Sequence, residues 1–285
     1  MPYHNLPPTQ TDPSRQMFPH ALGLAPGLGR MTGRRILVVG GGQRKITDAE
    51  PPIGNGRGIC RVLGREGAKV AVLDHSFEAA QFVCDEIKGD NGFAVPIVAD
   101  ATDVARIKPS IEEAAKALGG LDGLVLNVGI TSVGLDKLTV EHWDDLFAIN
   151  VRSHMWYAKA GLECLEPGSS ILVISSLAGM RPGGHQPAYE ISKAAQYQLA
   201  RTVAFEGEPK GIRCNCLALG LIDSAMGRDE GKKRPDRARL VPFARQGTGW
   251  EVGYAALFFL SHESSYVNAQ TLCVDGGQVF GVVRK

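Results

Sequence analysis

The sequence predicts a single-domain α/β fold, a doubly wound parallel sheet of about seven strands with helices on both faces. Three observations support this prediction. Short apolar runs alternate with helical patterns from residue 34 onward. The runs are continuous stretches of Val, Ile and Leu, as expected for parallel strands that helices cover on both faces. No internal repeat or change in composition divides residues 34–285, which predicts one domain.

The expected elements alternate along the chain as β–α units with right-handed crossovers. The strands are expected at 35–40, 69–73, 93–98, 123–127, 170–175, 212–217 and 270–274. Helical periodicity occurs near 57–66, 77–88, 104–118, 139–165, 188–208 and 250–260. Residues 225–245 are rich in Arg, Lys and Asp, and this composition predicts a mobile excursion rather than a part of the core.

Residues 1–33 contain many prolines and little periodicity, and we interpret them as an N-terminal tail, disordered or draped over a neighbouring element. The net charge of +1 on 285 residues favours neither nucleic acid nor an anionic membrane as a partner. The chain shows no transmembrane run and no signal-peptide pattern, so we expect a cytoplasmic protein. The six cysteines are scattered, which predicts reduced thiols and no metal site.

The first expected strand and helix have the form of a phosphate-binding strand–turn–helix, but the glycines are split. Gly40 ends the strand, and Gly54-Asn55-Gly56 leads into the helix. Glycines let the backbone approach a pyrophosphate, and the free N–H groups of a helix N-terminus bind it. The alternative is a glycine-rich loop without a ligand. We interpret residues 44–53 as an insertion whose ends stay close, which leaves the phosphate site intact.

The second expected strand ends in Asp74. A carboxylate about 20 residues past the glycines can accept hydrogen bonds from both hydroxyls of an adenosine ribose, and it repels a 2′-phosphate. We therefore expect NAD as the cofactor, with NADP disfavoured. The alternative role of Asp74 is to cap the next helix, although Ser76 could serve as that cap instead.

Tyr189 and Lys193 are four residues apart at the start of an expected helix, so their side chains face the same side. A Tyr hydroxyl has an ordinary pKa of about 10, and a nearby ammonium lowers this pKa toward the working range. Ser176 ends the preceding strand, where its hydroxyl can hold and polarise a carbonyl oxygen. The three side chains can move a proton while a cofactor moves a hydride. The Tyr–Lys spacing alone is common in helices.

Taken together, these residues resemble the short-chain dehydrogenase/reductase family over residues 34–280. The matching pieces occur in order along the chain: the glycine turn, Asp74, Asp100, "LNVG" at 126–129, Asn150, Ser176, Tyr189, Lys193, "RCNCLALGLIDSAM" at 213–226 and "CVDGG" at 273–277. The resemblance implies a Rossmann fold and an NAD(P)-dependent oxidoreductase acting on CH–OH groups. It also implies a homotetramer or homodimer assembled through the helices 139–165 and 188–208.

The resemblance assigns a role to each matching residue. Tyr189 would be the general acid/base, Lys193 would lower its pKa and hold the nicotinamide ribose, and Ser176 would bind the substrate oxygen. Asn150 would anchor a water that relays protons through Lys193. The remaining cofactor contacts would be Gly40, Gly54, Asn55, Gly56 and Asp74, with Asp100 and Ala101 at the adenine, Asn127 and Gly129 at the adenosine ribose, and Ile222 and Ser224 at the nicotinamide amide.

The chain departs from the family pattern at several points. Val39 replaces a Thr, Leu219-Gly220 replaces Pro-Gly, and thirteen residues (41 to 53) separate Gly40 from Gly54, ten more than usual. We expect Arg44 or Lys45 of the insertion to contact the pyrophosphate or a neighbouring subunit. His185 is a candidate wall of the substrate pocket, and the alternative is a position in a solvated loop.

The predicted function is hydride transfer between NAD(H) and a secondary alcohol/ketone pair, a small-molecule substrate. One alternative is a 3-oxoacyl-thioester reductase, an activity that usually prefers NADPH and against which Asp74 argues. Another is a family member that binds cofactor without catalysis and serves as a structural or regulatory subunit. The intact set of Asn150, Ser176, Tyr189 and Lys193 argues against it. We expect the substrate pocket in the loops at 130–138, 177–188 and 221–245.

Overall fold

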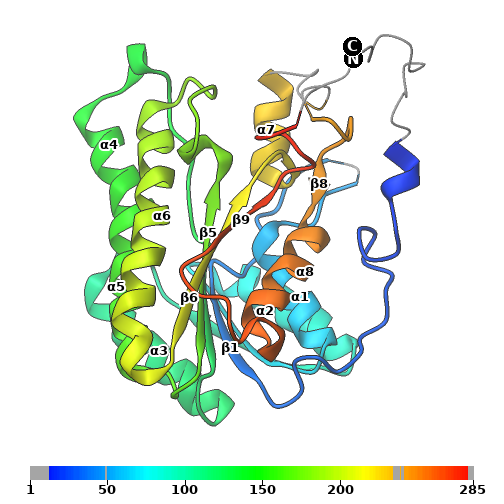
Figure 1. The fold of residues 1–285 in the computed structure, drawn as a ribbon, viewed down its shortest axis with the longest axis vertical. Helices are drawn as coiled ribbons and strands as arrows, with labels where there is room; N and C mark the ends of the chain where they lie inside the picture. Colours follow the sequence, from blue (N-terminus) through cyan, green and yellow to red (C-terminus); the bar gives the residue numbers. More distant parts are fainter. Residues whose placement is uncertain (1–12, 49, 234–237, 239–240, 282–285) are drawn as a thin grey trace.

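Seven strands form one parallel sheet, as the sequence predicted (Figure 1). The computed structural model describes residues 13–48, 50–233, 238 and 241–281. The strands are β1 (Arg35–Val39), β2 (Lys69–Asp74), β3 (Phe93–Val98), β4 (Gly123–Leu126), β5 (Ser170–Ser176), β6 (Arg213–Leu219) and β9 (Thr271–Val274). Their order is β3-β2-β1-β4-β5-β6-β9. The order reverses direction between β1 and β4, which creates the crevice in which such sheets bind ligands.

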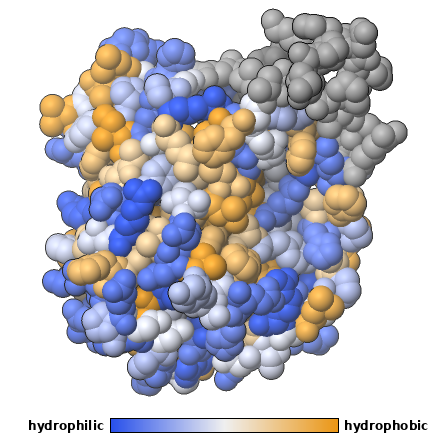
Figure 2. Space-filling model, in the orientation of Figure 1, coloured by the Kyte–Doolittle hydropathy of each residue, from blue (hydrophilic) through white to orange (hydrophobic). Residues whose placement is uncertain are grey.

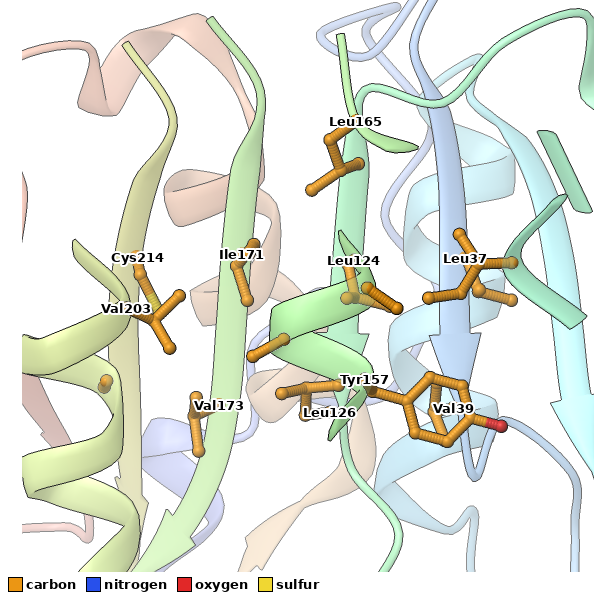
Figure 3. Close-up of a cluster of buried hydrophobic side chains, with 14 of the residues drawn as sticks. Leu37, Val39, Leu124, Leu126, Tyr157, Leu165, Ile171, Val173, Val203 and Cys214 are labelled. Atoms are coloured by element: carbon orange, nitrogen blue, oxygen red, sulfur yellow. The ribbon is translucent and has the colours of Figure 1, made fainter. Parts of the chain in front are cut away.

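Helices cover both faces of the sheet (Figure 1). One face carries α1 (Asn55–Arg65), α2 (Phe77–Gly89) and α8 (Gly249–Leu260), and the other carries α3 (Val104–Leu118), α4 (Val140–Phe147), α5 (Ser153–Cys164) and α6 (Pro187–Gly207). Side chains of each strand alternate between the two cores, since Leu37 and Val39 pack on one side while Ile36 and Val38 pack on the other. Figure 3 shows the first of these clusters, in which Tyr157 of α5 joins Leu37 and Val39.

The helix expected at 139–165 is interrupted. A π-helical turn, Ala148–Arg152, lies between α4 and α5. Such turns occur where local bonds compete with the regular helix, and here the buried Asn150 side chain bonds Ile130 instead of solvent. The π turn therefore places Asn150 inside the fold, under the loop that follows β4.

The expected excursion at 225–245 is in part a helix. Residues 225–233 form α7 (Ala225–Lys233), and the short strands β7 (Ile222–Asp223) and β8 (Gly247–Thr248) pair at its base. Ser224 accepts a hydrogen bond from the Gly227 amide, with an N···Oγ distance of 3.1 Å, which supports the first turn of α7. Residues 234–237 and 239–240 lie outside the described part of the chain.

Residues 13–33 are draped over α1 and α8, one of the two expected arrangements. Glu66 is buried and accepts hydrogen bonds from the amides of Leu28 and Arg30. Arg65 donates to the carbonyls of Gly23 and Ala25, so residues 23–30 are held at the end of α1. Residues 1–12 lie outside the described chain. In the described residues no helix is long and apolar enough to cross a membrane.

Candidate active site

The residues that the sequence singles out meet at the carboxyl edge of the sheet. Gly40 follows β1, Asn127 follows β4 and Ser176 ends β5, so three neighbouring strands deliver them to one place. Gly40 adopts a φ of +77°, a left-handed conformation that favours glycine. The Asn127 side-chain amide donates to the Gly40 carbonyl at 2.7 Å and ties the two strand ends together.

The two glycine clusters lie against each other despite the insertion. A Cβ on Gly56 would lie 2.1 Å from the Gly40 carbonyl oxygen, so only glycine permits this approach of α1 to the β1 turn. The side-chain oxygen of Gln43 accepts a hydrogen bond from the Gly54 amide at 2.8 Å, which holds the ends of the insertion together. The expectation that its ends stay close is confirmed.

The N-terminus of α1 fits a pyrophosphate. Its N-cap, Gly54, provides no side-chain cap, and its first turn contains no acidic residue. The side-chain oxygen of Asn55 is buried and has no hydrogen-bond partner in the described protein. An anionic group of a cofactor would accept hydrogen bonds from the free N–H groups and would be favoured by the helix dipole. A hydroxyl group of the same cofactor would donate a hydrogen bond to the Asn55 oxygen. The residues present therefore fit a dinucleotide.

Asp74 lies at the end of β2 beside this turn. One carboxylate oxygen accepts from the Gly42 amide at 3.2 Å, and the other accepts from the Ser76 amide at 3.1 Å. Ser76 is the N-cap of α2, since its hydroxyl accepts from the Ala79 amide at 3.2 Å. The carboxylate oxygens keep further acceptor capacity toward a ribose, because a carboxylate has about four lone-pair sites.

Asp100 and Ala101 follow β3, the neighbour of β2. The backbone amide and hydroxyl of Thr102 both donate to the Asp100 carboxylate, each at 2.8 Å, and they lower the pKa of Asp100. Ala101 is buried. Ile222 is also buried, at the start of β7, on the far side of the sheet edge from Asp100. The predicted cofactor contacts thus extend along one edge of the sheet.

Tyr189 and Lys193 lie one turn apart at the start of α6, and the Lys193 nitrogen is 5.6 Å from the centre of the Tyr189 ring. Burial raises the pKa of Tyr189, and a hydrogen bond with the Ser176 side chain opposes that shift. Ser176 and Tyr189 therefore lie within reach of a common substrate oxygen. The expectation that Lys193 lowers the Tyr189 pKa stays a prediction.

Lys193 is almost fully buried, and this burial lowers its pKa to about 8. Its ammonium donates to the Ile174 carbonyl at 3.2 Å and to the side-chain oxygen of Gln196 at 3.1 Å. A Cβ on Gly129 would lie 3.5 Å from the same nitrogen. The missing side chain at Gly129 thus leaves space beside Lys193, where the family resemblance implies the cofactor.

The Asn150 side chain holds the loop after β4 through hydrogen bonds to its backbone. Its side chain accepts from the Ile130 amide at 2.9 Å and donates to the Ile130 carbonyl at 3.0 Å and to the Ser192 hydroxyl at 3.1 Å. Its main-chain carbonyl accepts a hydrogen bond from the Gln196 amide at 2.7 Å. Gln196, which sequence reasoning missed, could have been noticed as a polar residue three positions after Lys193 and on the same helix face.

The insertion contacts α7 through ion pairs. Arg44 pairs with Asp229 at 2.5 Å, and Arg228 pairs with Asp48 at 3.1 Å. Arg228 also donates to the Glu50 carbonyl at 2.6 Å. These contacts connect residues 44–50 to α7. The expected contact of Arg44 or Lys45 with a pyrophosphate stays a prediction.

His185 lines a surface hollow at the start of α6, together with Gly134, Leu135, Asp136, Pro187 and Glu190. The hollow is not lined by Ser176 or Tyr189, and the role of His185 as a wall of the substrate pocket stays a prediction. Among the described residues no group of His, Cys, Asp and Glu could hold a metal ion. The Ser132 hydroxyl, in the loop after β4, is buried without a partner in the described chain and was not singled out from the sequence.

The chain is similar to known oxidoreductases over most of its length. A family model described as Enoyl-(Acyl carrier protein) reductase matches residues 53–278. An uncharacterized oxidoreductase of Escherichia coli (strain K12), YghA, is 34% identical over 262 residues, 90% of this chain and 86% of that protein. The acetoacetyl-CoA reductase of Synechocystis sp. is 31% identical over 249 residues, 85% of this chain and 95% of that protein.

Solved structures show the same fold. A short chain dehydrogenase from Burkholderia cenocepacia J2315, in complex with NADP, matches with a TM-score of 0.80 at 29% identity, over 87% of this chain and 99% of that one. A doubly wound sheet with Ser176, Tyr189 and Lys193 at its carboxyl edge defines an oxidoreductase that uses a nicotinamide cofactor. The chain belongs to the short-chain dehydrogenase/reductase family, which the sequence predicted.

Proposed function

We propose that this protein transfers a hydride between NAD(H) and a secondary alcohol/ketone pair, with Tyr189 as the general acid/base. The observation that supports this most directly is the meeting of Ser176, Tyr189 and Lys193 at the edge of the sheet to which Gly40 and Asn127 also belong. The bound nicotinamide would supply or accept the hydride at the substrate carbon.

The side chains would divide the remaining work. During reduction, the Tyr189 hydroxyl donates its proton to the substrate oxygen as negative charge develops there, and during oxidation it takes the proton back. The Ser176 hydroxyl donates a hydrogen bond to the same oxygen and orients it. The Lys193 ammonium, buried beside Tyr189, favours the phenolate form electrostatically. These roles are those that the family resemblance implies.

The preference for NAD rests on Asp74. A carboxylate at the end of β2 repels a 2′-phosphate, whereas it accepts hydrogen bonds from ribose hydroxyls. The Burkholderia cenocepacia relative was solved with NADP, so membership of the family leaves the choice between the two cofactors open. The acetoacetyl-CoA reductase among the relatives favours a 3-oxoacyl-thioester reductase as the second candidate function.

The first experiment is a fluorescence titration of the purified protein with NADH and NADPH. We expect tighter binding of NADH, and we expect Asp74→Ser to improve NADPH binding about tenfold, because about 1.4 kcal/mol of charge repulsion is removed. Asp144→Ser, at an exposed position of α4, is the matched control. Equal or tighter NADPH binding by the wild-type protein would overturn the NAD assignment, and acetoacetyl-CoA with NADPH would then be the substrate to assay.

Catalysis is tested separately with Tyr189→Phe. We expect the variant to bind NADH normally and to lose about 10²–10⁴-fold in kcat on any secondary alcohol that the wild type oxidises. Equal turnover in the two proteins would remove Tyr189 from the mechanism. Absence of turnover by both proteins across alcohols and ketones, with NADH still bound, would support the non-catalytic subunit.

We further propose a homotetramer or homodimer in the cytoplasm. The helices expected to assemble it expose large apolar side chains, including Trp156 on α5 and Phe205 on α6. The edge strand β9 is a second candidate for the contact between subunits. Figure 2 shows apolar side chains gathered along the middle of the face on which β9 lies, and Leu272 of β9 is 43% exposed. The molar mass measured by light scattering after size-exclusion chromatography tests the oligomeric state, and the mass of a monomer would contradict the proposal.

A further inference from the structure

A buried glutamine lies between the lysine of the site and the main chain of Asn150. The side-chain oxygen of Gln196 accepts from the Lys193 ammonium at 3.1 Å, and its amide nitrogen donates to the Asn150 carbonyl at 2.7 Å. Gln196 has no exposed surface. The family resemblance implies a relay water between Lys193 and Asn150, and here a side-chain amide makes contact with both residues.

His154 holds this amide from the other side. The Gln196 nitrogen is 2.9 Å from Nδ1 of His154, and Nε2 of His154 is 2.9 Å from the Val128 carbonyl. A carbonyl can only accept, so Nε2 carries the proton of the ring and Nδ1 accepts from Gln196. The amide nitrogen thus donates both protons, and the amide oxygen faces the ammonium. A single orientation of each side chain satisfies all of these contacts.

The titratable groups that face Lys193 are neutral at pH 7, so the ammonium is the charged group among them. Burial and the charge of Lys193 lower the pKa of His154 to about 3, so the ring from α5 is neutral at pH 7. Burial raises the pKa of Cys216, on β6, to about 12. Tyr189, on α6 itself, is also protonated, because burial raises its pKa and Glu230 of α7 adds to that effect. Neutral oxygens from Ile174 and Gln196 solvate the ammonium.

We propose that Gln196 is a positioning residue for Lys193 and that His154 fixes the Gln196 amide. The inference rests on the proposed function of Tyr189 and Lys193. A water accepts one proton and releases another, whereas an amide accepts at oxygen and donates at nitrogen without passing a proton on. The pair therefore orients the ammonium and does not itself carry protons.

The first test measures Lys193 directly in the protein without cofactor. The pKa of Lys193 is followed by ¹³C NMR of lysine Cε, with the signal assigned by its loss in Lys193→Arg. In Gln196→Met, of similar length and helix propensity, we expect the pKa to fall by about one unit, because the ammonium loses an acceptor while it stays buried. Gln198→Met, at an exposed position of the same helix, should leave it unchanged.

A second variant distinguishes a direct effect of Gln196 on the Lys193 pKa from a general disturbance of the structure. Gln196→Glu keeps the shape and the acceptor but adds a negative charge, so we expect the pKa of Lys193 to rise in this protein. Shifts of opposite sign in the two variants support the proposal. Equal pKa values of Lys193 in wild type, Gln196→Met and Gln196→Glu would overturn it, whether or not the protein binds NADH.

The kinetic test compares the pH profiles of kcat for alcohol oxidation. In Gln196→Met we expect the rising limb to move up by about one unit, because a less charged Lys193 stabilises the Tyr189 phenolate less. His154→Leu should shift the limb in the same direction, and His154→Gln, which keeps a polar acceptor, should restore it in part. An unmoved limb in Gln196→Met contradicts the proposal, whereas failure of the wild type to bind NADH or NADPH contradicts the proposed function alone.

Discussion

Gly56→Ala tests the close approach of α1 to the turn after β1. The new Cβ would lie 2.1 Å from the Gly40 carbonyl oxygen, 2.8 Å from the Asn127 amide nitrogen and 3.0 Å from the Gly41 Cα. Two of these three neighbours are backbone atoms, which cannot rotate away. The N-terminus of α1 must therefore move by about 1 Å, the scale at which overpacking disrupts a site.

The cost follows from three contributions. Overpacking against backbone costs about 1–3 kcal/mol, and weakening the hydrogen bond from Asn127 to Gly40 adds about 1 kcal/mol. Replacing a helical glycine by alanine offsets at most about 1 kcal/mol. We expect a net loss of about 2 kcal/mol in the free energy of unfolding. NADH affinity should fall about 10–100-fold, since displaced N–H groups lose charge-assisted hydrogen bonds to phosphate.

Urea unfolding followed by circular dichroism and NADH fluorescence titration measure the two effects. Gly89→Ala is the matched control, because Gly89 is also helical and a Cβ there meets nothing within 4 Å. This control should be neutral or slightly more stable and should bind NADH as the wild type does. If Gly56→Ala behaves like Gly89→Ala in both assays, the glycine turn is not the cofactor site and the reasoning fails.

Three further predictions concern charge. Burial raises the pKa of Asp122, but hydrogen bonds from Arg35 outweigh this effect and lower the pKa overall. The ionised Asp122 therefore stabilises the folded state above the ordinary carboxyl range, and this stabilisation is lost as the pH falls through the lowered pKa. Asp122→Asn should therefore remove part of the acid dependence of urea unfolding. The pKa of His154 is lowered to about 3, so the unfolded state binds a proton that the folded state does not bind as the pH falls below about 6.5. We expect the free energy of unfolding to fall by about 1.4 kcal/mol per pH unit in this range, and His154→Gln should abolish that slope. Arg228→Ala removes the pair with Asp48 and the bond to the Glu50 carbonyl, while the pair between Arg44 and Asp229 remains, so the insertion is held to α7 less firmly. We expect faster NADH dissociation in stopped-flow experiments with little change in unfolding. An unchanged rate would show that the contacts of Arg228 do not restrain the insertion.

The regular elements were predictable because their signals are local. The strand ends agree with the expected ranges within about two residues, since continuous runs of Val, Ile and Leu occur only where both faces are buried. The π turn at Asn150 was not predictable, because it depends on hydrogen bonds to Ile130, twenty residues earlier in the chain. The helix in 225–233 was missed for a related reason. Its charged side chains include Arg228, which bonds Asp48 and Glu50 across the fold.

The sequence by itself determined the alternation of strands and helices, the spacing of Tyr189 and Lys193 on one helix face, and the family to which the chain belongs. These properties follow from short-range periodicity and from residues at set separations. The tertiary structure alone decided that the insertion reaches α7 and that Gln196 joins Lys193 to Asn150 and His154, residues 42 to 46 positions away. Such contacts depend on how helices from distant parts of the chain pack on the sheet, and no local pattern encodes that packing.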